Sequence, residues 1–220
     1  MSKVPPHLFR WFLLTLALIG SSVHAGVTLT NDQASFSALG AIVEDNDFEG
    51  IVYNDGPGLA SPGDPWTVDG VTYTTGNNII VGPASGLGVS SNVFTVNSFG
   101  SPLTGSLVSN YNMFGFDIGT LLASSAVDLT LTTNLGSYNF LNQSVPLQSA
   151  MSFFGFIAGS GEYFTGFSIT PLAGDSLAAL DNVMLGEVTP VPEPTVFVML
   201  LAGLSIVVLY GRKLRAISIC

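Results

Sequence analysis

The stretch from Gly26 to Pro190 contains no Lys, Arg, His or Cys, and this absence constrains the fold and chemistry of the chain strongly. The basic residues lie near the two ends of the sequence, at Lys3, Arg10, Arg212, Lys213 and Arg215. Both histidines, His7 and His24, precede the stretch, and the single cysteine is Cys220. All 15 acidic residues except Glu193 lie inside it. The stretch must therefore fold without a disulfide and without an ion pair between its own side chains.

These missing residue types exclude whole classes of function for the stretch. A nucleic-acid binder needs cations to neutralise phosphates, and a Walker-type phosphate loop needs its lysine. Serine and cysteine nucleophile systems need an imidazole base, and structural zinc sites need His or Cys ligands. What remains is carboxylate chemistry, either hard-cation binding or acid–base work by paired Asp and Glu. We therefore expect no nucleic-acid partner.

The N-terminal segment has the three parts of a secretory signal peptide. Lys3 and Arg10 form a basic region, Trp11 to Ile19 is apolar, and Val23-His24-Ala25 resembles a small-residue cleavage site. We expect residues 1–25 to be a signal peptide that is cut after Ala25. The alternative is an uncleaved membrane anchor.

The C-terminal segment also has three parts in a fixed order. Val191-Pro192-Glu193-Pro194 is followed by an uncharged apolar run from Thr195 to Gly211, and then by Arg212-Lys213-Leu214-Arg215. The run reaches the lower limit for a bilayer-spanning helix, about 17 residues. A basic cluster on one flank holds that end in the cytoplasm, so Gly26 to Pro194 should lie outside.

This order of Pro-Glu-Pro, apolar helix and basic stub resembles the PEP-CTERM sorting signal of Gram-negative bacteria. The motif residues are Val191, Pro192, Glu193, Pro194, Arg212, Lys213 and Arg215. The resemblance implies an exosortase-type membrane protease as partner. It also implies a precursor anchored in the inner membrane and a mature protein at the cell surface or in the extracellular matrix. A simple single-pass anchor is the alternative for this segment.

The chain between these signals has the length of one domain. Short alternating runs, bounded by Gly, Pro, Asn and Asp, predict an all-β fold of the β-sandwich type. We expect the β-sandwich ectodomain at residues 26–186 and a Pro-rich linker at 187–194. A transmembrane helix at 195–211 and a cytoplasmic stub at 212–220 complete the predicted order.

Several local signals predict individual elements. Asp32 can cap a helix from Gln33 to Leu39, with Phe36 and Leu39 on one face. Asp69-Gly70 predicts a two-residue hairpin between Trp66-Thr67-Val68 and Val71-Thr72-Tyr73. Strict alternation predicts that Val127, Leu129 and Leu131 face the core.

Two Phe-Gly-Phe triplets, Phe114-Gly115-Phe116 and Phe154-Gly155-Phe156, predict a further pair of core strands. In each triplet both Phe side chains point to one face of the sheet, and Gly leaves room on the other face. Leu180-Asp181-Asn182-Val183-Met184-Leu185 predicts the last strand.

The domain resembles secreted PEP-CTERM proteins of the jelly-roll, lectin-like type. The matching pieces are Phe48-Glu49-Gly50, Phe114-Gly115-Phe116-Asp117-Ile118, Phe153-Phe154-Gly155-Phe156 and Leu180-Asp181-Asn182-Val183. In calcium-bearing jelly-roll modules, a Glu near the first strand and an Asp near the last one meet at one ion. By this resemblance, Glu49 and Asp181 are candidate calcium ligands.

The residues themselves give these two acids different settings. Asp45, Asp47 and Glu49 echo the start of an EF-hand loop, but Gly56 stands where its bidentate Glu belongs, so we reject that motif. If the segment is a strand, these three share one face while Phe48 points into the core. The alternative to calcium is a solvated strand end. Asp181 sits among apolar neighbours and needs a backbone donor, a hydroxyl or a metal ion as partner.

Aromatic side chains are the remaining candidates for sugar stacking: Trp66, Tyr53, Tyr73, Tyr111 and Tyr163. Core or hairpin packing is the alternative role for most of them. Our leading hypothesis is a non-enzymatic surface or matrix protein that binds extracellular polysaccharide. A glycan-cleaving enzyme with two carboxylates and a purely structural coat protein without ligand are the alternatives.

Overall fold

The computed structural model describes residues 26–51, 61–83, 91–96, 98–148, 150–189 and residue 203. The leader, the Pro-Glu-Pro motif and the basic stub lie outside these residues, as does the apolar run apart from Gly203. Backbone contacts divide the chain into two units, Met1–Val188 and Thr189–Cys220. Within the described residues, no helix has the length and apolar character needed to cross a membrane.

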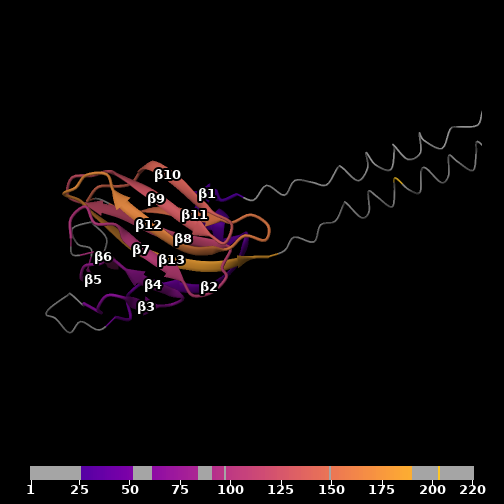
Figure 1. Ribbon diagram of the computed structural model, residues 1–220, viewed down its shortest axis with the longest axis horizontal. Helices are drawn as coiled ribbons and strands as arrows, with labels where there is room; N and C mark the ends of the chain where they lie inside the picture. The colour runs from indigo at the N-terminus through magenta and orange to yellow at the C-terminus, as the bar shows by residue number, and fades with distance from the viewer. Residues whose placement is uncertain are drawn as a thin grey trace, which may run out of the picture. The chain divides into compact units, whose positions relative to one another are not determined.

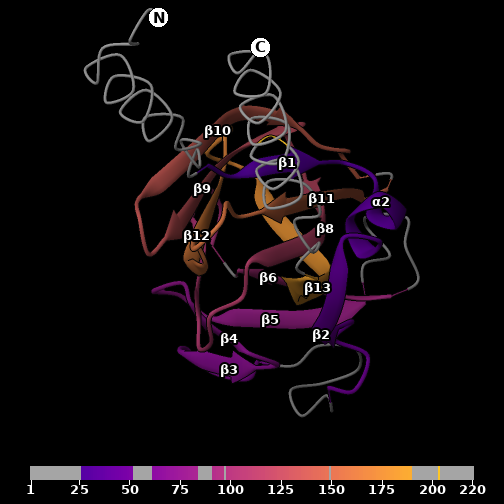
Figure 2. The same ribbon diagram turned by 90° about the vertical axis from the view of Figure 1, so that its right-hand side faces the viewer.

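The first unit is built from two antiparallel sheets, with strands from distant parts of the sequence side by side (Figures 1 and 2). One sheet has the order β1-β11-β8-β13-β6-β5, and β2 also pairs with β13. Its strands are β1 (Thr28–Thr30), β2 (Gly40–Asn46), β5 (Ile79–Pro83), β6 (Asn92–Val96), β8 (Met113–Leu121), β11 (Ser152–Ile157) and β13 (Leu177–Val188).

The other sheet has the order β10-β9-β12-β7-β4-β3. Its strands are β3 (Trp66–Val68), β4 (Val71–Thr74), β7 (Leu103–Leu107), β9 (Ala126–Thr133), β10 (Ser137–Ser144) and β12 (Phe164–Pro171). A short helix, α2 (Gln33–Ser37), precedes β2. The predicted all-β, two-sheet class is confirmed for the described part of the chain.

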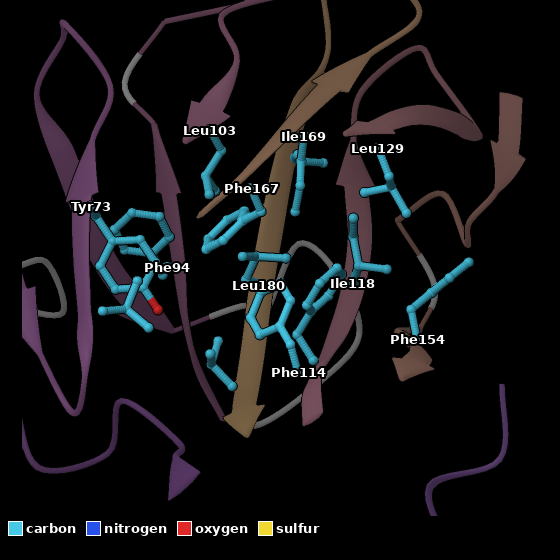
Figure 3. Close-up of a cluster of buried hydrophobic side chains, with 14 of the residues drawn as sticks. Tyr73, Phe94, Leu103, Phe114, Ile118, Leu129, Phe154, Phe167, Ile169 and Leu180 are labelled. Carbon is cyan, nitrogen blue, oxygen red and sulfur yellow. The ribbon is translucent and has the colours of Figure 1, made fainter. Parts of the chain in front are cut away.

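The core lies between the two sheets and draws on both of them (Figure 3). The rings of Phe114 on β8 and Phe167 on β12 meet with centroids 4.9 Å apart. The three predicted inward residues of β9, Val127, Leu129 and Leu131, are buried, so that prediction is confirmed. Because residues 26–190 contain no basic side chain, apolar burial is the main favourable term for the folding of the domain.

The β3–β4 hairpin forms at the predicted place. Trp66 pairs with Tyr73 and Val68 pairs with Val71. The two turn residues, Asp69 and Gly70, both have positive φ, at 39° and 77°. Positive φ at both central positions is the geometry that two-residue hairpins favour, because it matches the strand twist.

Helix α2 is shorter than predicted, and Leu39 lies beyond its end. Asp32 caps it as expected, accepting a 3.2 Å hydrogen bond from the Ala34 N–H. Phe36 is buried, but Leu39 is 46% exposed. The helix ends at Ser37, and β2 begins three residues later at Gly40. A Cβ added at Gly40 would stand 2.1 Å from the Glu187 carbonyl oxygen. Gly40 therefore permits close approach to β13.

Strand β13 is longer than the predicted last strand. It runs from Leu177 to Val188, and Glu187 and Val188 still pair with Ala41 and Gly40 on β2. The strand therefore extends two residues into the segment for which the sequence predicts an extended linker.

Candidate functional site

A β-bulge in β13 determines where Asp181 points. Asn182 has a positive φ of 46°, and the pairing with β8 shifts register between Asp181 and Met184. Leu180 and Val183 both reach the core, whereas Asp181 lies on the opposite side of the sheet from its neighbour Leu180. There it stands directly across from Asp117 of β8. The bulge thus removes an acidic side chain from the apolar core.

Asp181 is 3% exposed, and each of its carboxylate oxygens accepts one hydrogen bond. The hydroxyl of Ser91 donates to Oδ2 at 2.6 Å, and the backbone N–H of Asn182 donates to Oδ1 at 2.8 Å. The Asn182 side-chain amide donates to Oδ2 of Asp117 at 2.7 Å. Two of the partner types expected from the sequence, a hydroxyl and a backbone donor, are therefore present.

Glu49 approaches this site from a turn after β2. Its Oε1 accepts a 2.6 Å hydrogen bond from the backbone N–H of Asn92, the residue after Ser91. Burial raises the pKa of Asp181, the hydrogen bonds from Ser91 and Asn182 oppose this, and the charges of Asp117 and Glu49 raise it further. Asp181 and Glu49 therefore bond two consecutive residues, Ser91 and Asn92. We call Glu49, Asp117 and Asp181 the acidic cluster.

The segment from Asp45 to Glu49 is a strand only as far as Asn46, so its three acids do not share one strand face. β2 ends at Asn46, and Phe48 has a positive φ of 57°. The side chains of Asn46 and Asp47 accept hydrogen bonds from the N–H groups two residues on, at 2.8 Å and 3.0 Å. Such local bonds compete with strand pairing. Phe48 does reach the core, as predicted, at 1% exposure.

Metal ligation by protein side chains alone finds little support in the geometry. Across the described ranges, no group of three or more His, Cys, Asp or Glu side chains is arranged to hold an ion. The acidic cluster offers oxygen donors only, which are the ligands that calcium takes. Each ionised carboxylate oxygen also keeps acceptor capacity beyond one hydrogen bond. An ion there would need backbone carbonyls or water to complete its coordination.

The outer face of the six-stranded sheet carries hydroxyl and amide side chains in two rows that cross the strands. The first row follows the register Ser137, Thr132, Gly166, Ser106, Thr72 and Thr67, in which Gly166 of β12 leaves a gap without a side chain. The second row follows Asn139, Thr130, Ser168, Thr104 and Thr74. We call these two rows the hydroxyl face.

The hydroxyl face points away from the core because its residues alternate with core residues. Its side chains are exposed except for four that are half-buried: Thr72, Thr104, Thr130 and Ser168. In β9, Thr130 and Thr132 alternate with the buried Leu129 and Leu131. Neighbouring side chains across the strands are in contact: the Thr67 and Thr72 hydroxyls lie 2.9 Å apart, and the Thr130 hydroxyl donates to Asn139 Oδ1 at 2.9 Å. Neither row contains a charged or aromatic side chain, so the face offers hydrogen bonds alone.

The aromatic stacking candidates are mostly part of the core. Tyr73 and Tyr111 are 0% and 6% exposed. Half-buried Trp66 stacks on Phe94 with centroids 5.9 Å apart. Packing is therefore the role of these three. Tyr163 is half-buried, and Tyr53 lies outside the described residues.

Sequence reasoning missed Asp117 and the hydroxyl face. Alternation marked the polar positions of single strands, and a Thr or Ser recurs there in β4, β7, β9 and β12. That recurrence was the available signal. The strand order that aligns those positions into rows depends on long-range pairing, which local patterns do not specify. Asp117 was visible only as part of a Phe-Gly-Phe match.

No family model and no curated protein sequence matches the chain. The solved structures similar to this chain include carbohydrate-binding modules. A family 29 module from Piromyces equi is 10% identical, with a TM-score of 0.33, and the match covers 74% of this chain and 91% of that one. The CBM22-1 xylan-binding domain from Paenibacillus barcinonensis is 13% identical, with a TM-score of 0.36 and coverage of 68% and 97%. A family 11 module from Clostridium thermocellum, solved with a β-1,3-1,4-mixed-linked tetrasaccharide, is 12% identical, with a TM-score of 0.35 and coverage of 67% and 98%.

Proposed function

We propose that this chain is an exported, non-enzymatic protein of the cell surface or extracellular matrix, sorted through its PEP-CTERM-like tail, and that it binds polysaccharide. The observation that carries the binding proposal is the hydroxyl face. Its rows span five and six strands of one sheet without a charge. A surface of this kind suits an extended, uncharged polymer.

Hydroxyl and amide side chains both donate and accept hydrogen bonds, as sugar hydroxyls do. The cross-strand rows repeat at the strand spacing, about 4.8 Å, so one ligand chain can meet several strands in turn. Without aromatic rings on the rows, binding relies on many modest hydrogen bonds. The acidic domain, with no basic side chain from Gly26 to Pro190, repels anionic polymers. A neutral polysaccharide is therefore the favoured ligand class.

The burial of Asp181 supports a non-enzymatic role. A glycosidase needs two carboxyl groups that flank a bound sugar. In the acidic cluster, Asp181 is 3% exposed and both of its oxygens accept hydrogen bonds, so it is poorly placed to transfer a proton to a ligand. The hydroxyl face itself carries no carboxylate pair.

Calcium at Glu49 and Asp181 is a further part of the proposal. An ion held by these carboxylates would offset their repulsion and join the turn after β2 to the last strand. The all-oxygen donor set and the electrostatic coupling of the two residues support it.

A glycan array with a parallel reducing-sugar assay separates the three functional hypotheses. The expected result is binding to neutral glycans without release of reducing ends. Release of reducing ends would instead identify a glycan-cleaving enzyme. The absence of both binding and cleavage would leave a structural coat protein without ligand.

Sorting is tested in a host that has an exosortase. A reporter fused after Cys220 should be active only in the cytoplasm, and the mature protein should lack the 195–220 tail. Replacing Pro192-Glu193-Pro194 with alanines should leave the tail attached. Intact-mass measurement that finds the tail on both proteins would contradict processing and leave a single-pass anchor.

A further inference from the structure

The carboxylate of Glu162 is buried without a cationic side chain to balance it. Glu162 lies in the loop between β11 and β12 and is 2% exposed. Its Oε1 accepts a 2.6 Å hydrogen bond from the Thr133 hydroxyl, and Oε2 makes no hydrogen bond of ordinary geometry. A buried charge needs a compensating partner. The stretch from Gly26 to Pro190 has no Lys, Arg or His to provide one.

The register of β1 on β11 carries the backbone of Gly26 toward the loop that holds this carboxylate. Strand β1 pairs with β11 so that Thr28 is opposite Ile157. If the same antiparallel register continues for two residues, Gly26 is opposite Gly159. The N–H of Glu162 donates to the Gly159 carbonyl at 3.0 Å, which folds the loop back toward the same level. The backbone N–H groups of Gly159 and Gly26 both lower the pKa of the Glu162 carboxyl group.

We propose that cleavage after Ala25 delivers the new α-ammonium group of Gly26 to the carboxylate of Glu162, and that this ion pair locks β1 onto the sandwich. The proposal rests on the proposed export of the chain, because the cleavage belongs to it. Residues 1–25 then have a second role besides directing export, because their removal creates a cationic group in a domain that has no basic side chain.

The chemistry is a peptide-bond hydrolysis that consumes one water molecule. The C–N bond between Ala25 and Gly26 breaks, the hydroxyl of water goes to the Ala25 carbonyl carbon, and a hydrogen goes to the Gly26 nitrogen. At neutral pH the Ala25 acid loses a proton and the Gly26 amine takes one up. An uncharged amide with one N–H thereby becomes an ammonium group with three.

The ion pair would stabilise strand β1, which has few other contacts to hold it in the sheet. β1 is a three-residue edge strand and pairs only with β11 among the described strands. Charge-assisted hydrogen bonds are about twice as strong as neutral ones. The uncut precursor keeps a neutral nitrogen at this position and lacks the ion pair. Processing should therefore make the domain more stable after export than before it.

Several groups face the Glu162 carboxylate. Burial alone would raise the pKa of Glu162, but the hydrogen bonds of Thr133 and Tyr138 and the N–H groups of Gly159 and Gly26 bring it below its ordinary value. Tyr138 of β10 is the titratable neighbour, and its hydrogen bond to Glu162 raises the Tyr138 pKa. The carboxylate is thus held ionised, ready for a cation.

The test uses the chain without its signal peptide, exported in a host that has no exosortase so that residues 195–220 stay attached, and purified in a non-ionic detergent. N-terminal sequencing should find Gly26 as the first residue, and a different first residue would overturn the proposal at this step. A Lys213→Arg background leaves the α-amine as the only amine, so acetylation modifies that group alone. Acetylation should lower the melting temperature by several degrees. The same treatment should leave Glu162→Gln unchanged.

The pH dependence has a definite sign. The ion pair raises the pKa of the folded α-ammonium group above its unfolded value, about 8. Its stabilisation is therefore complete below about pH 8 and is lost as pH rises through the folded pKa. The melting difference between the free and acetylated chains should vanish in alkali. A 15N-NMR titration of the Gly26 amine should show the raised pKa directly, and Glu162→Gln should restore it.

A positional control keeps the charge of the α-ammonium group but moves that group away from Glu162. Inserting one Ser between Ala25 and Gly26 displaces the new α-amine by about 3.5 Å, and the melting temperature should fall as it does on acetylation. An ordinary Gly26 amine pKa, with a melting temperature insensitive to acetylation, would refute the lock even if Glu162→Gln failed to fold. Glycan binding is measured on the same samples, so that failure of the proposed function is recognised separately.

Discussion

Gly155 on β11 lies directly opposite Gly115 on β8, and the ring of Phe36 covers them both. The flanking Phe residues of the two triplets point to the other side of the sheet, into the main core. Phe36, Met113, Phe153 and Met184 form a second, smaller cluster on the glycine side. The two glycines leave room on this face, as the triplets predict, and Phe36 of α2 fills that room.

Substitution of Gly155 tests this packing of Phe36 on the two glycines. A Cβ at position 155 would stand 2.6 Å from Phe36 Cδ2 and 2.8 Å from Phe153 Cε1. Overpacking of this kind costs about 1–3 kcal/mol, so Gly155→Ala should lower the free energy of unfolding by that amount in urea titrations. Gly136→Ala is the matched control, because no atom lies within 4 Å of its added Cβ. Equal stability of both variants would contradict close packing of Phe36 on Gly155.

Tyr73 carries a hydroxyl that the core does not satisfy. The side chain is 0% exposed, its hydroxyl has no hydrogen-bond partner, and burial raises its pKa. Tyr73→Phe removes the unpaired group and keeps the ring packed on Phe94. It should raise the free energy of unfolding by about 1 kcal/mol. Tyr138→Phe should lower it, because the Tyr138 hydroxyl lowers the pKa of Glu162 and so favours the ionised form of that buried carboxylate. A loss of stability in Tyr73→Phe would show an unrecognised partner.

Calcium should stabilise the domain through the acidic cluster. A ligand at 100 times its dissociation constant stabilises by about 2.7 kcal/mol, so the melting temperature should be several degrees higher in millimolar calcium than in chelator. Asp181→Asn should abolish the difference, whereas the exposed Asp175→Asn should keep it. A calcium-independent melting temperature in the unsubstituted chain would eliminate the ion.

The same residue predicts a pH effect in chelator. The folded pKa of Asp181 stands above its unfolded value, mainly because of burial, so the ionised form reduces stability at neutral pH. Lowering the pH through the folded pKa should stabilise the unsubstituted chain relative to Asp181→Asn. The relative gain should level off near the unfolded value, about pH 3.9. Melting curves of the two proteins from pH 7 to pH 4 measure this.

Local sequence patterns predicted the strands whose two faces differ most in polarity. The inward residues of β9, the β3–β4 turn and the two triplets follow from alternation, turn chemistry and glycine placement. These signals act over a few residues, and neighbouring strands reinforce them. The buried setting of Asp181 was predicted from its apolar neighbours for the same reason.

Features that depend on long-range pairing were not predictable in this way. The bulge at Asn182 adds a residue that no periodicity announces, and it sets Asp181 across from Asp117. The turn through Phe48 arises from Asn46 and Asp47 side chains that bond the backbone instead of continuing β2. The rows of the hydroxyl face exist only because β9, β12, β7 and β4 are neighbours in the sheet.

Binding by the hydroxyl face is tested most directly with three substitutions at its centre: Ser106→Ala, Thr132→Val and Ser168→Ala. Each removes a hydroxyl worth about 0.5–1.5 kcal/mol in a hydrogen bond, so the triple variant should bind about tenfold more weakly or worse. Thr28→Val, an exposed hydroxyl on the other sheet, is the matched control. Equal melting temperatures would confirm that the fold is intact.

The decisive measurement is affinity gel electrophoresis of the mature chain through gels that contain a neutral β-glucan, a xylan or a galactomannan. We predict that at least one polymer retards the unsubstituted chain and the Thr28→Val control equally, and that the triple variant migrates freely. Retardation of the triple variant as strong as that of the unsubstituted chain, or no retardation by any polymer, would contradict polysaccharide binding by the hydroxyl face.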